Sequence, residues 1–273
     1  MIKIGKWIKS ILILLFSMLF LTPLYVAVIN AVKPYDEVIK APLQLPKRFT
    51  FDNFVDAYQS SHILDLYKNS LTITVVSVAL LILLSSMAAY VIARRTGRFF
   101  RFLYAFALAG IMVPPVVTLV PSIKTLGMLN LLYTLPGLYF FYVGTYFSTA
   151  IFLYVQFIKT IPASMDEAAT IDGAGQLTVF FQIIFPMLKP CTTTAVIFLS
   201  MWIWNDFLNP MYILGIKGGS TITTGIFSAI GSYTSKWNLV FANVILASLP
   251  IVLLYLVMQK QFMEGMTSGA IKG

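Results

Sequence analysis

Residues 11–21 read ILILLFSMLFL, an apolar run without the alternation that a membrane β-strand shows over about 10 residues. A transmembrane helix needs roughly 20 apolar residues to cross about 30 Å of hydrocarbon. Six stretches are long enough, at approximately 10–32, 70–93, 102–121, 135–158, 191–212 and 239–259. Because the bilayer core offers no water to backbone groups, each stretch is predicted to be a helix.

The composition of the whole chain agrees with a lipid environment. Of the 273 residues, 59% are hydrophobic and 11% are charged, and the mean hydropathy is +0.86. Soluble domains carry about 25% charged residues. A water-soluble globule is therefore excluded, and we expect an all-α polytopic membrane protein with six transmembrane helices.

Two features bear on the ends and the orientation. The first stretch follows Lys3, Lys6 and Lys9, as in a signal peptide, but it exceeds the usual 7–15 apolar residues and lacks an A-x-A site, so we expect it to stay uncleaved. Four arginines fall within RRTGRFFR at 94–101, between two stretches. Cytoplasmic loops are rich in Lys and Arg, which predicts that both termini are cytoplasmic.

The residue inventory argues against several functions. The formal net charge of +9 comes from basic residues scattered between apolar runs, which favours membrane flanks over nucleic-acid binding. The single cysteine, Cys191, excludes an internal disulfide, and the single histidine, His62, excludes a His-rich metal cluster, so no metal site is expected. The chain has no G-x-x-x-x-G-K-[ST] phosphate loop. We expect no bound cofactor and no enzymatic activity.

The loops between the stretches differ in character. The outer segment 33–69 contains FTFDNFVDAYQ at 49–59, which predicts a short surface helix capped by Asp52. The outer segment 213–238 is rich in Gly, Ser and Thr and is expected to be a mobile loop.

The inner segment 159–190, KTIPASMDEAATIDGAGQLTVFFQIIFPMLKP, carries the strongest local signal. Ser164 and Glu167 have the spacing of a capping box, which predicts a helix beginning at Ser164. Met165, Ala168, Ala169 and Asp172 would share one small, mildly apolar face of it. From the residues alone, this helix is either a docking element for a soluble partner or an interfacial helix that packs on the bundle.

The same segment resembles the EAA loop of ABC importer permeases. Glu167-Ala168-Ala169 is followed after three residues by Gly173, and after nine more by Ile183-x-Phe185-Pro186, with Phe185 where the family has leucine. The C-terminal QKQFMEGMTSGAIKG at 259–273 and WNDF at 204–207 are similar to sequences of the maltose-type carbohydrate permeases. The resemblance covers roughly 69–273.

The resemblance implies a MetI-like ABC type I importer permease fold. It divides the chain into residues 1–68, an N-terminal helix with an outer loop, residues 69–262, the transmembrane core, and residues 263–273, a cytoplasmic tail.

It further implies a subunit of the bacterial plasma (inner) membrane that takes up a sugar, specifically an oligosaccharide. The partners would be a second, non-identical permease, two ATPase subunits that use ATP and Mg, and an extracytoplasmic sugar-binding protein that meets the outer segments 33–69 and 213–238.

Carried over by position, the resemblance assigns one group of residues to coupling with the ATPase and a second group to contact with it. The coupling loop would use Glu167, Ala168, Ala169, Gly173, Ile183 and Pro186. The tail would use Thr267, Gly269 and Lys272.

Substrate contacts are expected in the fourth and fifth stretches, because an ionisable residue within a span is a functional candidate. The candidates are Trp204, Asn205, Asp206 and Asn209 in the fifth stretch and Tyr142 and Tyr146 in the fourth. Alternatively, Trp204 anchors at the membrane interface with Asp206 in water, and the tyrosines are packing surface.

A self-contained secondary transporter is the alternative function. Such carriers normally place acidic residues in several spans, and here Asp206 is the one candidate.

Overall fold

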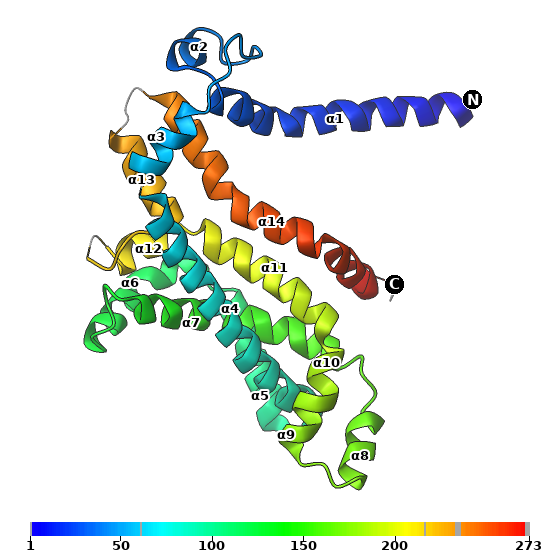
Figure 1. The fold of residues 1–273 in the computed structure, drawn as a ribbon. Coiled ribbons are helices and arrows are strands. Elements are labelled where there is room, and N and C mark those ends of the chain that lie inside the picture. Colours follow the sequence, from blue (N-terminus) through cyan, green and yellow to red (C-terminus); the bar gives the residue numbers. More distant parts are fainter. Residues whose placement is uncertain (1, 61, 216, 233–235, 271–273) are drawn as a thin grey trace. The chain divides into compact units, whose positions relative to one another are not determined.

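All the secondary-structure elements are helices in the residues that the computed structural model describes, which are 2–60, 62–215, 217–232 and 236–270. In chain order the elements are α1 (Ile2–Ala31), α2 (Tyr35–Lys40), α3 (Asp52–Ser60), α4 (Ile63–Arg94), α5 (Arg98–Ile111), α6 (Pro115–Met128), α7 (Leu135–Ile158), α8 (Ser164–Ile171), α9 (Gln176–Thr178), the π-helix η1 (Val179–Ile184), α10 (Phe185–Met187), α11 (Lys189–Asn205), α12 (Leu208–Ile213), α13 (Ile222–Ser232) and α14 (Trp237–Ala270) (Figure 1). The predicted all-α membrane fold is confirmed.

Within the described residues, four helices are long and apolar enough to cross a membrane. They are Lys9–Ala31 of α1, all of α4, all of α7, and Trp237–Lys260 of α14. Two bent pairs also pass the same test, Arg98–Ile111 with Pro115–Met128 and Gln176–Met187 with Lys189–Asn205. If each pair is one span, the six predicted stretches are all accounted for.

The third predicted stretch, 102–121, is interrupted at Pro114 and Pro115, as this pair of prolines in the sequence indicates. The axes of α5 and α6 differ by 104°, because the chain leaves the helical conformation at Pro114, with φ −62° and ψ 132°. Proline disfavours helical geometry in the residue before it, and here Pro115 follows Pro114 directly. Pro115 itself fits the first turn of α6, where its missing N–H costs nothing.

The fifth predicted stretch, 191–212, is also interrupted. Helix α11 ends at Asn205, and Asp206 is extended with ψ 130° before the short α12 begins. The chain therefore presents a carboxylate at a break between two helices.

The contacts divide the chain into two units. One contains Met1–Leu66 and Gly225–Leu249, and the other contains Tyr67–Thr224 and Pro250–Gly273. Residues 225–249, expected within the transmembrane core, thus group with the N-terminal segment.

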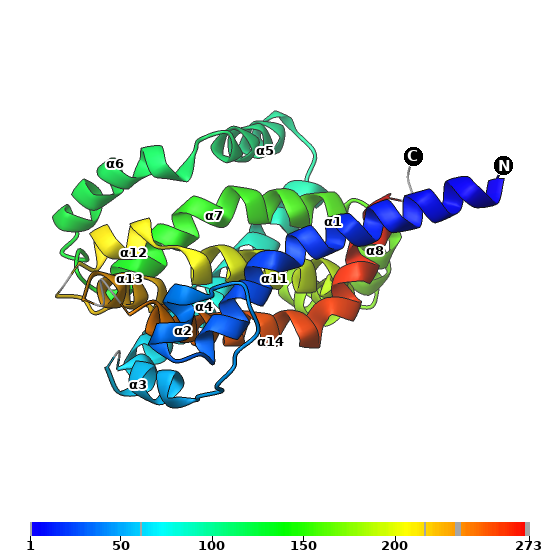
Figure 2. The same cartoon turned by 90° about the horizontal axis from the view of Figure 1, so that it is seen from above.

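Helix α7 is the centre of the larger unit. It packs against α5 and α6 and against α11 and α12, which lie along different sides of it in Figure 2. Near its start, Leu138 and Tyr142 are fully buried in a cluster with Leu199. Near its end, Tyr154 and Ile158 are fully buried in a second cluster with segments 179–188. One helix therefore supports α12 at one end of the unit and α8 at the other.

In the smaller unit, the predicted helix at 49–59 is present as α3. Asn53 is buried and donates to the carbonyls of Ala31 at 2.8 Å and Lys33 at 2.7 Å, which fixes α3 to the end of α1. The expected loop at 213–238 is wrong in part, because α13 occupies Ile222–Ser232. The first residues of α13 belong to the larger unit, where the backbone N–H of Ile222 donates to the Ser70 hydroxyl at 2.8 Å.

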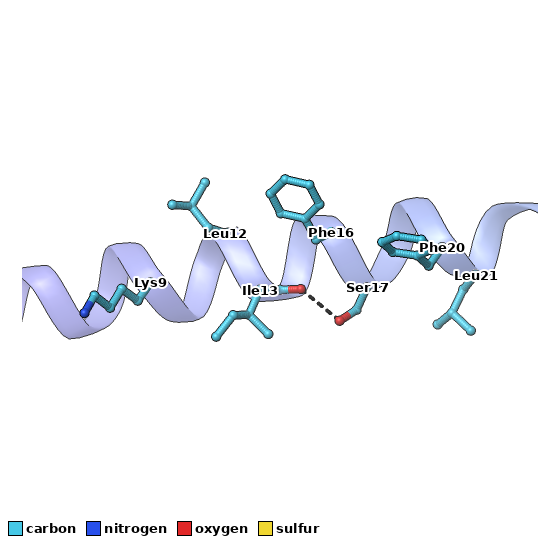
Figure 3. Close-up of a pocket in the computed structure, with 7 residues that line it drawn as sticks. All are labelled: Lys9, Leu12, Ile13, Phe16, Ser17, Phe20 and Leu21. Carbon is cyan, nitrogen blue, oxygen red and sulfur yellow. Dashed lines mark hydrogen bonds between the residues drawn. The ribbon is translucent and has the colours of Figure 1, made fainter. Parts of the chain in front are cut away.

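Helix α1 exposes large apolar side chains over most of its length. Leu12 is 49%, Phe16 61% and Phe20 80% exposed. Figure 3 shows these side chains with Lys9 and Ser17 along a shallow groove formed by this helix alone. A helix that is hydrophobic all round belongs in lipid, so this groove is membrane-facing surface and not a candidate site.

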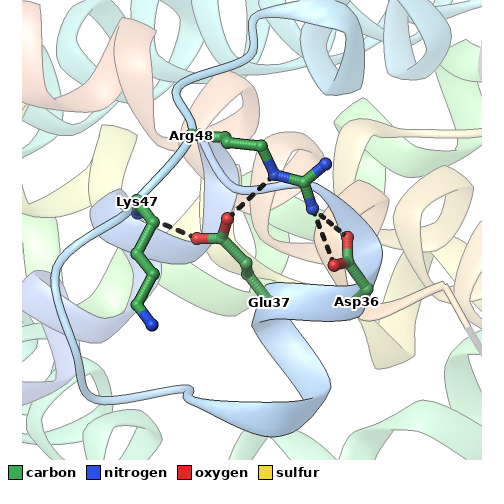
Figure 4. A network of polar contacts seen from close by, with 4 residues as sticks. All are labelled: Asp36, Glu37, Lys47 and Arg48. Carbon is green, nitrogen blue, oxygen red and sulfur yellow. Dashed lines mark hydrogen bonds and ion pairs between the residues drawn. The ribbon is translucent and has the colours of Figure 1, made fainter.

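In the segment after α1, ion pairs connect Arg48 to Asp36 and Glu37 of α2 (Figure 4). Arg48 makes a two-pronged contact with Asp36 at 2.7 and 2.9 Å and reaches Glu37 at 3.2 Å. The backbone N–H of Lys47 donates to Glu37 at 2.9 Å. This hydrogen bond, and then Arg48, lower the pKa of Glu37 below its ordinary value of 4.5.

Acid should therefore loosen this segment. Because the folded-state pKa of Glu37 is lowered, its stabilising contribution is complete above pH 4.5 and is lost as pH falls through the folded value. Hydrogen exchange of residues 34–48 should show stronger protection in wild type than in Glu37→Gln at neutral pH, with the difference vanishing at low pH. Comparing both proteins at each pH removes the intrinsic pH dependence of exchange, and equal protection at neutral pH would contradict the expectation.

Candidate functional site

Helix α8 begins differently from the prediction. The residue that caps it is Ala163, no side chain caps the first turn, and Ser164 is already helical. A residue with helical backbone cannot direct its hydroxyl at the free N–H groups of its own first turn, so the predicted Ser164–Glu167 capping box is wrong. The helix nevertheless exists where it was predicted.

The end of α8 is set by Gly173, which has φ +83°. The N–H of Gly173 donates to the carbonyl of Thr170 at 3.1 Å, and that of Ala174 donates to Ala169 at 3.0 Å. This pair of bonds is the Schellman motif, which closes a helix with a left-handed residue. Glycine adopts that conformation without the steric cost that a Cβ adds, so the turn depends on Gly173.

One face of α8 packs on the following segment. Ala169 is 7% exposed and belongs to the apolar cluster that contains Phe180 and Ile184. Those two side chains come from η1 and are almost completely buried. The expected common face of Ala168 and Ala169 is therefore divided, with Ala169 turned to the bundle and Ala168 turned outward.

A polar network on the same side holds α8 to the end of α4. Arg94 Nη2 lies 2.8 Å from Asp166 Oδ2, an ion pair between charges that are not aligned as a hydrogen bond. The Tyr90 hydroxyl donates to Asp166 Oδ1 at 2.6 Å. Arg94 Nη1 also donates to the carbonyl of Ile161 at 3.0 Å. Both charged side chains are only 16% exposed, so the network ties α4, the end of α7 and α8 together in partial shelter from water.

Asp166, Arg94 and Tyr90 are functional candidates that the sequence analysis does not include. Asp166 stands next to Glu167 in a first helical turn, where acidic residues are common for reasons of the helix dipole. A signal was present in α4, because Tyr90 and Arg94 are four residues apart and so lie on one face of a helix.

The outward face of α8 is unusual for a protein surface. Glu167 and Ala168 are exposed, and the large apolar side chain of Ile171 is 86% exposed at the end of the helix. Further along the loop, Ile183 is half-buried and Pro186 is exposed. The structure therefore gathers the coupling-loop candidates around an exposed helix that is held firmly on its inner face.

The tail candidates cannot be placed in the same way. Thr267 and Gly269 fall within α14, in a part whose side chains lie outside the described residues, and Lys272 lies outside the described residues altogether.

A second candidate site surrounds Asp206, at the break between α11 and α12. Its carboxylate accepts from the Tyr142 hydroxyl at 2.9 Å and from the Asn209 amide at 2.7 Å. Its backbone carbonyl accepts from the Thr223 hydroxyl at 2.7 Å. The buried Tyr142 thereby connects α7 to the break.

An open pocket of about 360 Å³ adjoins this carboxylate. Four of the substrate candidates line it, together with Trp202: Tyr146, Asn205, Asp206 and Asn209. The Tyr146 and Trp202 rings stack with centroids 5.4 Å apart.

Trp204 does not line this pocket. It is 4% exposed and stacks on Tyr67 at 6.4 Å, on another side of α11. Two positions along a helix differ by about 200° around its axis, which is why Trp202 and Trp204 diverge.

Comparisons with known proteins agree with this arrangement. Residues 81–267 match the family described as "Binding-protein-dependent transport system inner membrane component". The chain is 32% identical to the probable starch degradation products transport system permease protein AmyC of Thermoanaerobacterium thermosulfurigenes, over 99% of this chain and 98% of that one. It is 36% identical to the multiple sugar-binding transport system permease protein MsmG of Streptococcus mutans, over 99% and 98% of the two chains.

A solved structure shares the fold. It belongs to a bacterial ABC transporter involved in the import of the acidic polysaccharide alginate, with a TM-score of 0.83, 22% identity, and coverage of 95% of this chain and 97% of that chain. With a family match over most of its length and full-length relatives above 30% identity, this chain belongs to the family of binding-protein-dependent transport system inner membrane components, the permease subunits of ABC importers.

Proposed function

We propose that this chain is the permease subunit of an ABC importer that takes up a carbohydrate, specifically an oligosaccharide, delivered by an extracytoplasmic binding protein. The observation that carries the proposal is the identity to sugar permeases along essentially the whole chain. The aromatic stack beside amide and carboxylate groups supports it, because aromatic faces suit the C–H surfaces of sugars and the polar groups suit their hydroxyls.

In the proposed complex, a second, non-identical permease completes the membrane pathway, and two ATPase subunits bind ATP and Mg. The division into 1–68, 69–262 and 263–273 serves as the functional plan of the chain, with both termini cytoplasmic. The binding protein would meet residues 33–69 and 213–238 on the opposite side.

Helix α8 is the proposed contact with the ATPase. The exposed Glu167, Ala168 and Ile171 would enter the partner, with Ile171 supplying apolar area that is otherwise left in water. Ala169 would act from the inner face, and Gly173, Ile183 and Pro186 would set the path of the loop. Thr267, Gly269 and Lys272 remain the proposed contacts of the tail.

The Arg94–Asp166–Tyr90 network would allow the contact between α8 and the ATPase to transmit motion to the bundle. A helix bound by the ATPase transmits motion only if it cannot slide on its own bundle. The network and the packing of Ala169 supply that restraint, so that closure of the ATPases would move α4 and α7 together with α8.

The requirement for a left-handed residue at Gly173 can be tested by measuring how strongly loaded binding protein stimulates ATPase activity. Gly173→Val should abolish the stimulation of ATPase activity by loaded binding protein, because a β-branched residue at φ +83° is strained. Gly173→Asn should retain most of it, since asparagine tolerates this conformation. Gly175→Ala is the matched control, with ordinary φ and open space around a new Cβ. Equal effects of the valine and asparagine variants would contradict a conformational role.

Ion-pair loss should uncouple hydrolysis from transport. Asp166→Asn should raise the ATP consumed per sugar imported, because loss of the ion pair with Arg94 would let α8 move without the bundle. Asp172→Asn is the control at the residue that directly follows the helix, since Asp172 is exposed. Unchanged stoichiometry in assembled Asp166→Asn complexes would count against the network.

Trp202 lines the pocket beside Asp206 and Trp204 does not, so substitutions of the two should have different effects. Trp202→Ala should raise the KM for sugar transport on the order of tenfold through loss of the aromatic face, while Trp202→Phe should change it little. Trp204→Ala should instead lower thermal stability, because it removes a buried side chain. Transport assays and thermal unfolding of the purified complex separate the two, and an unchanged KM in Trp202→Ala would remove Trp202 from the substrate path.

A further inference from the structure

The loop that follows α2 turns back along α1 and is hydrogen-bonded to it (Figure 1). The Tyr25 hydroxyl of α1 donates to the carbonyl of Leu43 at 3.0 Å, and the Asn30 amide donates to that of Pro42 at 2.9 Å. Both donors belong to the membrane span Lys9–Ala31. The loop is therefore fixed beside the last turns of the span.

The length of the span places these contacts within the bilayer. Its 23 residues extend about 35 Å at 1.5 Å per residue, which exceeds the roughly 30 Å of hydrocarbon by about 5 Å. Tyr25 lies about 9 Å before the end of the span at Ala31 by the same measure. Even if the whole excess projected at this end, Tyr25 and the carbonyl of Leu43 would remain below the hydrocarbon boundary.

The backbone of this return loop, residues 41–46, has many of its polar groups paired. The buried Lys33 ammonium donates to the carbonyls of Ala41 at 2.9 Å and Pro42 at 3.4 Å. The N–H of Gln44 donates to Ala41 at 3.3 Å. The two prolines of the loop have no N–H to satisfy. With the bond from Tyr25, the first three carbonyls of the loop all accept hydrogen bonds, as backbone groups in hydrocarbon require.

The side chains that the return loop leaves uncovered are large and apolar. Leu43 is 65% and Leu45 is 70% exposed. They continue the apolar surface of α1, where Leu24 is 58% exposed. Tyr25 is itself 40% exposed, and tyrosine is common where a membrane protein meets the headgroup region. An apolar side chain that is uncovered at this depth meets acyl chains.

We propose that the return loop inserts into the leaflet in which α1 ends, with Leu43 and Leu45 among the upper acyl chains. Lipid is the occupant because the bonds from Tyr25 and Asn30 hold the loop below the end of the span. A docking platform for the binding protein would instead stand above the span. The buried apolar area would fix the depth at which α1 ends. The proposal concerns this loop alone and does not depend on the transported substrate.

Fluorescence quenching in the reconstituted full chain tests this depth. An NBD fluorophore is attached to single cysteines in a Cys191→Ser background, in phosphatidylcholine vesicles that contain a lipid with a nitroxide high on its acyl chain. Leu43→Cys tests the loop, Leu24→Cys is the reference at matched depth on α1, and Asp56→Cys is an exposed reference on α3. The label at Leu43→Cys should lose as much fluorescence to the lipid nitroxide as that at Leu24→Cys. The label at Asp56→Cys should be quenched by aqueous iodide instead.

A second variant tests the hydrogen bond that sets the depth. Tyr25→Phe removes the donor to the Leu43 carbonyl and keeps the ring, so it should reduce lipid quenching at Leu43→Cys and leave that at Leu24→Cys unchanged. Unchanged quenching at both positions would contradict the role of this bond.

The other occupants give different results. Quenching of the Leu43→Cys label by iodide alone, with protection when loaded binding protein is added, would assign the loop to that protein and overturn the membrane assignment. Quenching by neither agent would mean that protein covers the loop, which would also overturn it. Leu45→Cys provides the same comparison if Leu43→Cys does not fold. No sugar or ATP enters the measurement, so a negative result would leave the proposed import function untouched.

Discussion

The ion pair between Arg94 and Asp166 is the interaction on which the proposed working of this molecule depends. A helix as short as α8 is not stable by itself, and α8 also exposes the apolar side chain of Ile171. Its place against the bundle therefore depends on contacts with neighbouring segments. The pair is largely sheltered from water and is supported by Tyr90 and by the carbonyl of Ile161. Separating Arg94 from Asp166 would leave two partly buried charges without partners, which costs free energy. We therefore expect the end of α4 and helix α8 to move together.

Helix α7 extends this restraint across the larger unit. Its 24 residues span about 36 Å at 1.5 Å per residue. One end packs against the segments that hold α8, and the other contains Tyr142, which donates to Asp206. The breaks at Pro114 and Asp206 lie in the neighbouring elements, where the chain can change direction while α7 stays intact.

The parts of the fold that follow from local chemistry could be predicted from the sequence. Apolar runs long enough for the bilayer give the spans, and Gly173 gives the end of α8, because each depends on neighbouring residues alone. Pro114 and Pro115 signalled an interruption, but the 104° angle between α5 and α6 depends on how both pack on α7. The cap at Ala163 differs from the predicted one at Ser164 because a good capping residue does not ensure that the helix begins there.

Candidate residues that lie close together in the chain could be predicted from the sequence, whereas those brought together from distant elements could not. Glu167, Ala168 and Gly173 lie within one recognisable segment, whereas Asp166 gains its role from Arg94, 72 positions earlier, through a contact that no spacing reveals. Trp202 and Trp204 are chemically equivalent in the sequence, and only the packing of Trp204 on Tyr67 separates them. Asp206 was recognised as an ionisable residue within a span, but its partner Tyr142 comes from another helix.

The central claim, that α8 and α4 move as one body, is tested most directly by a distance measurement in the assembled transporter. Spin labels at Ser164 and at Val91, both exposed, in a Cys191→Ser background, report the separation of the two helices. The account predicts the same distance distribution with and without ATP, and a broadened distribution when Asp166→Asn is added. A nucleotide-dependent shift between these labels in the protein with Asp166 intact would contradict it.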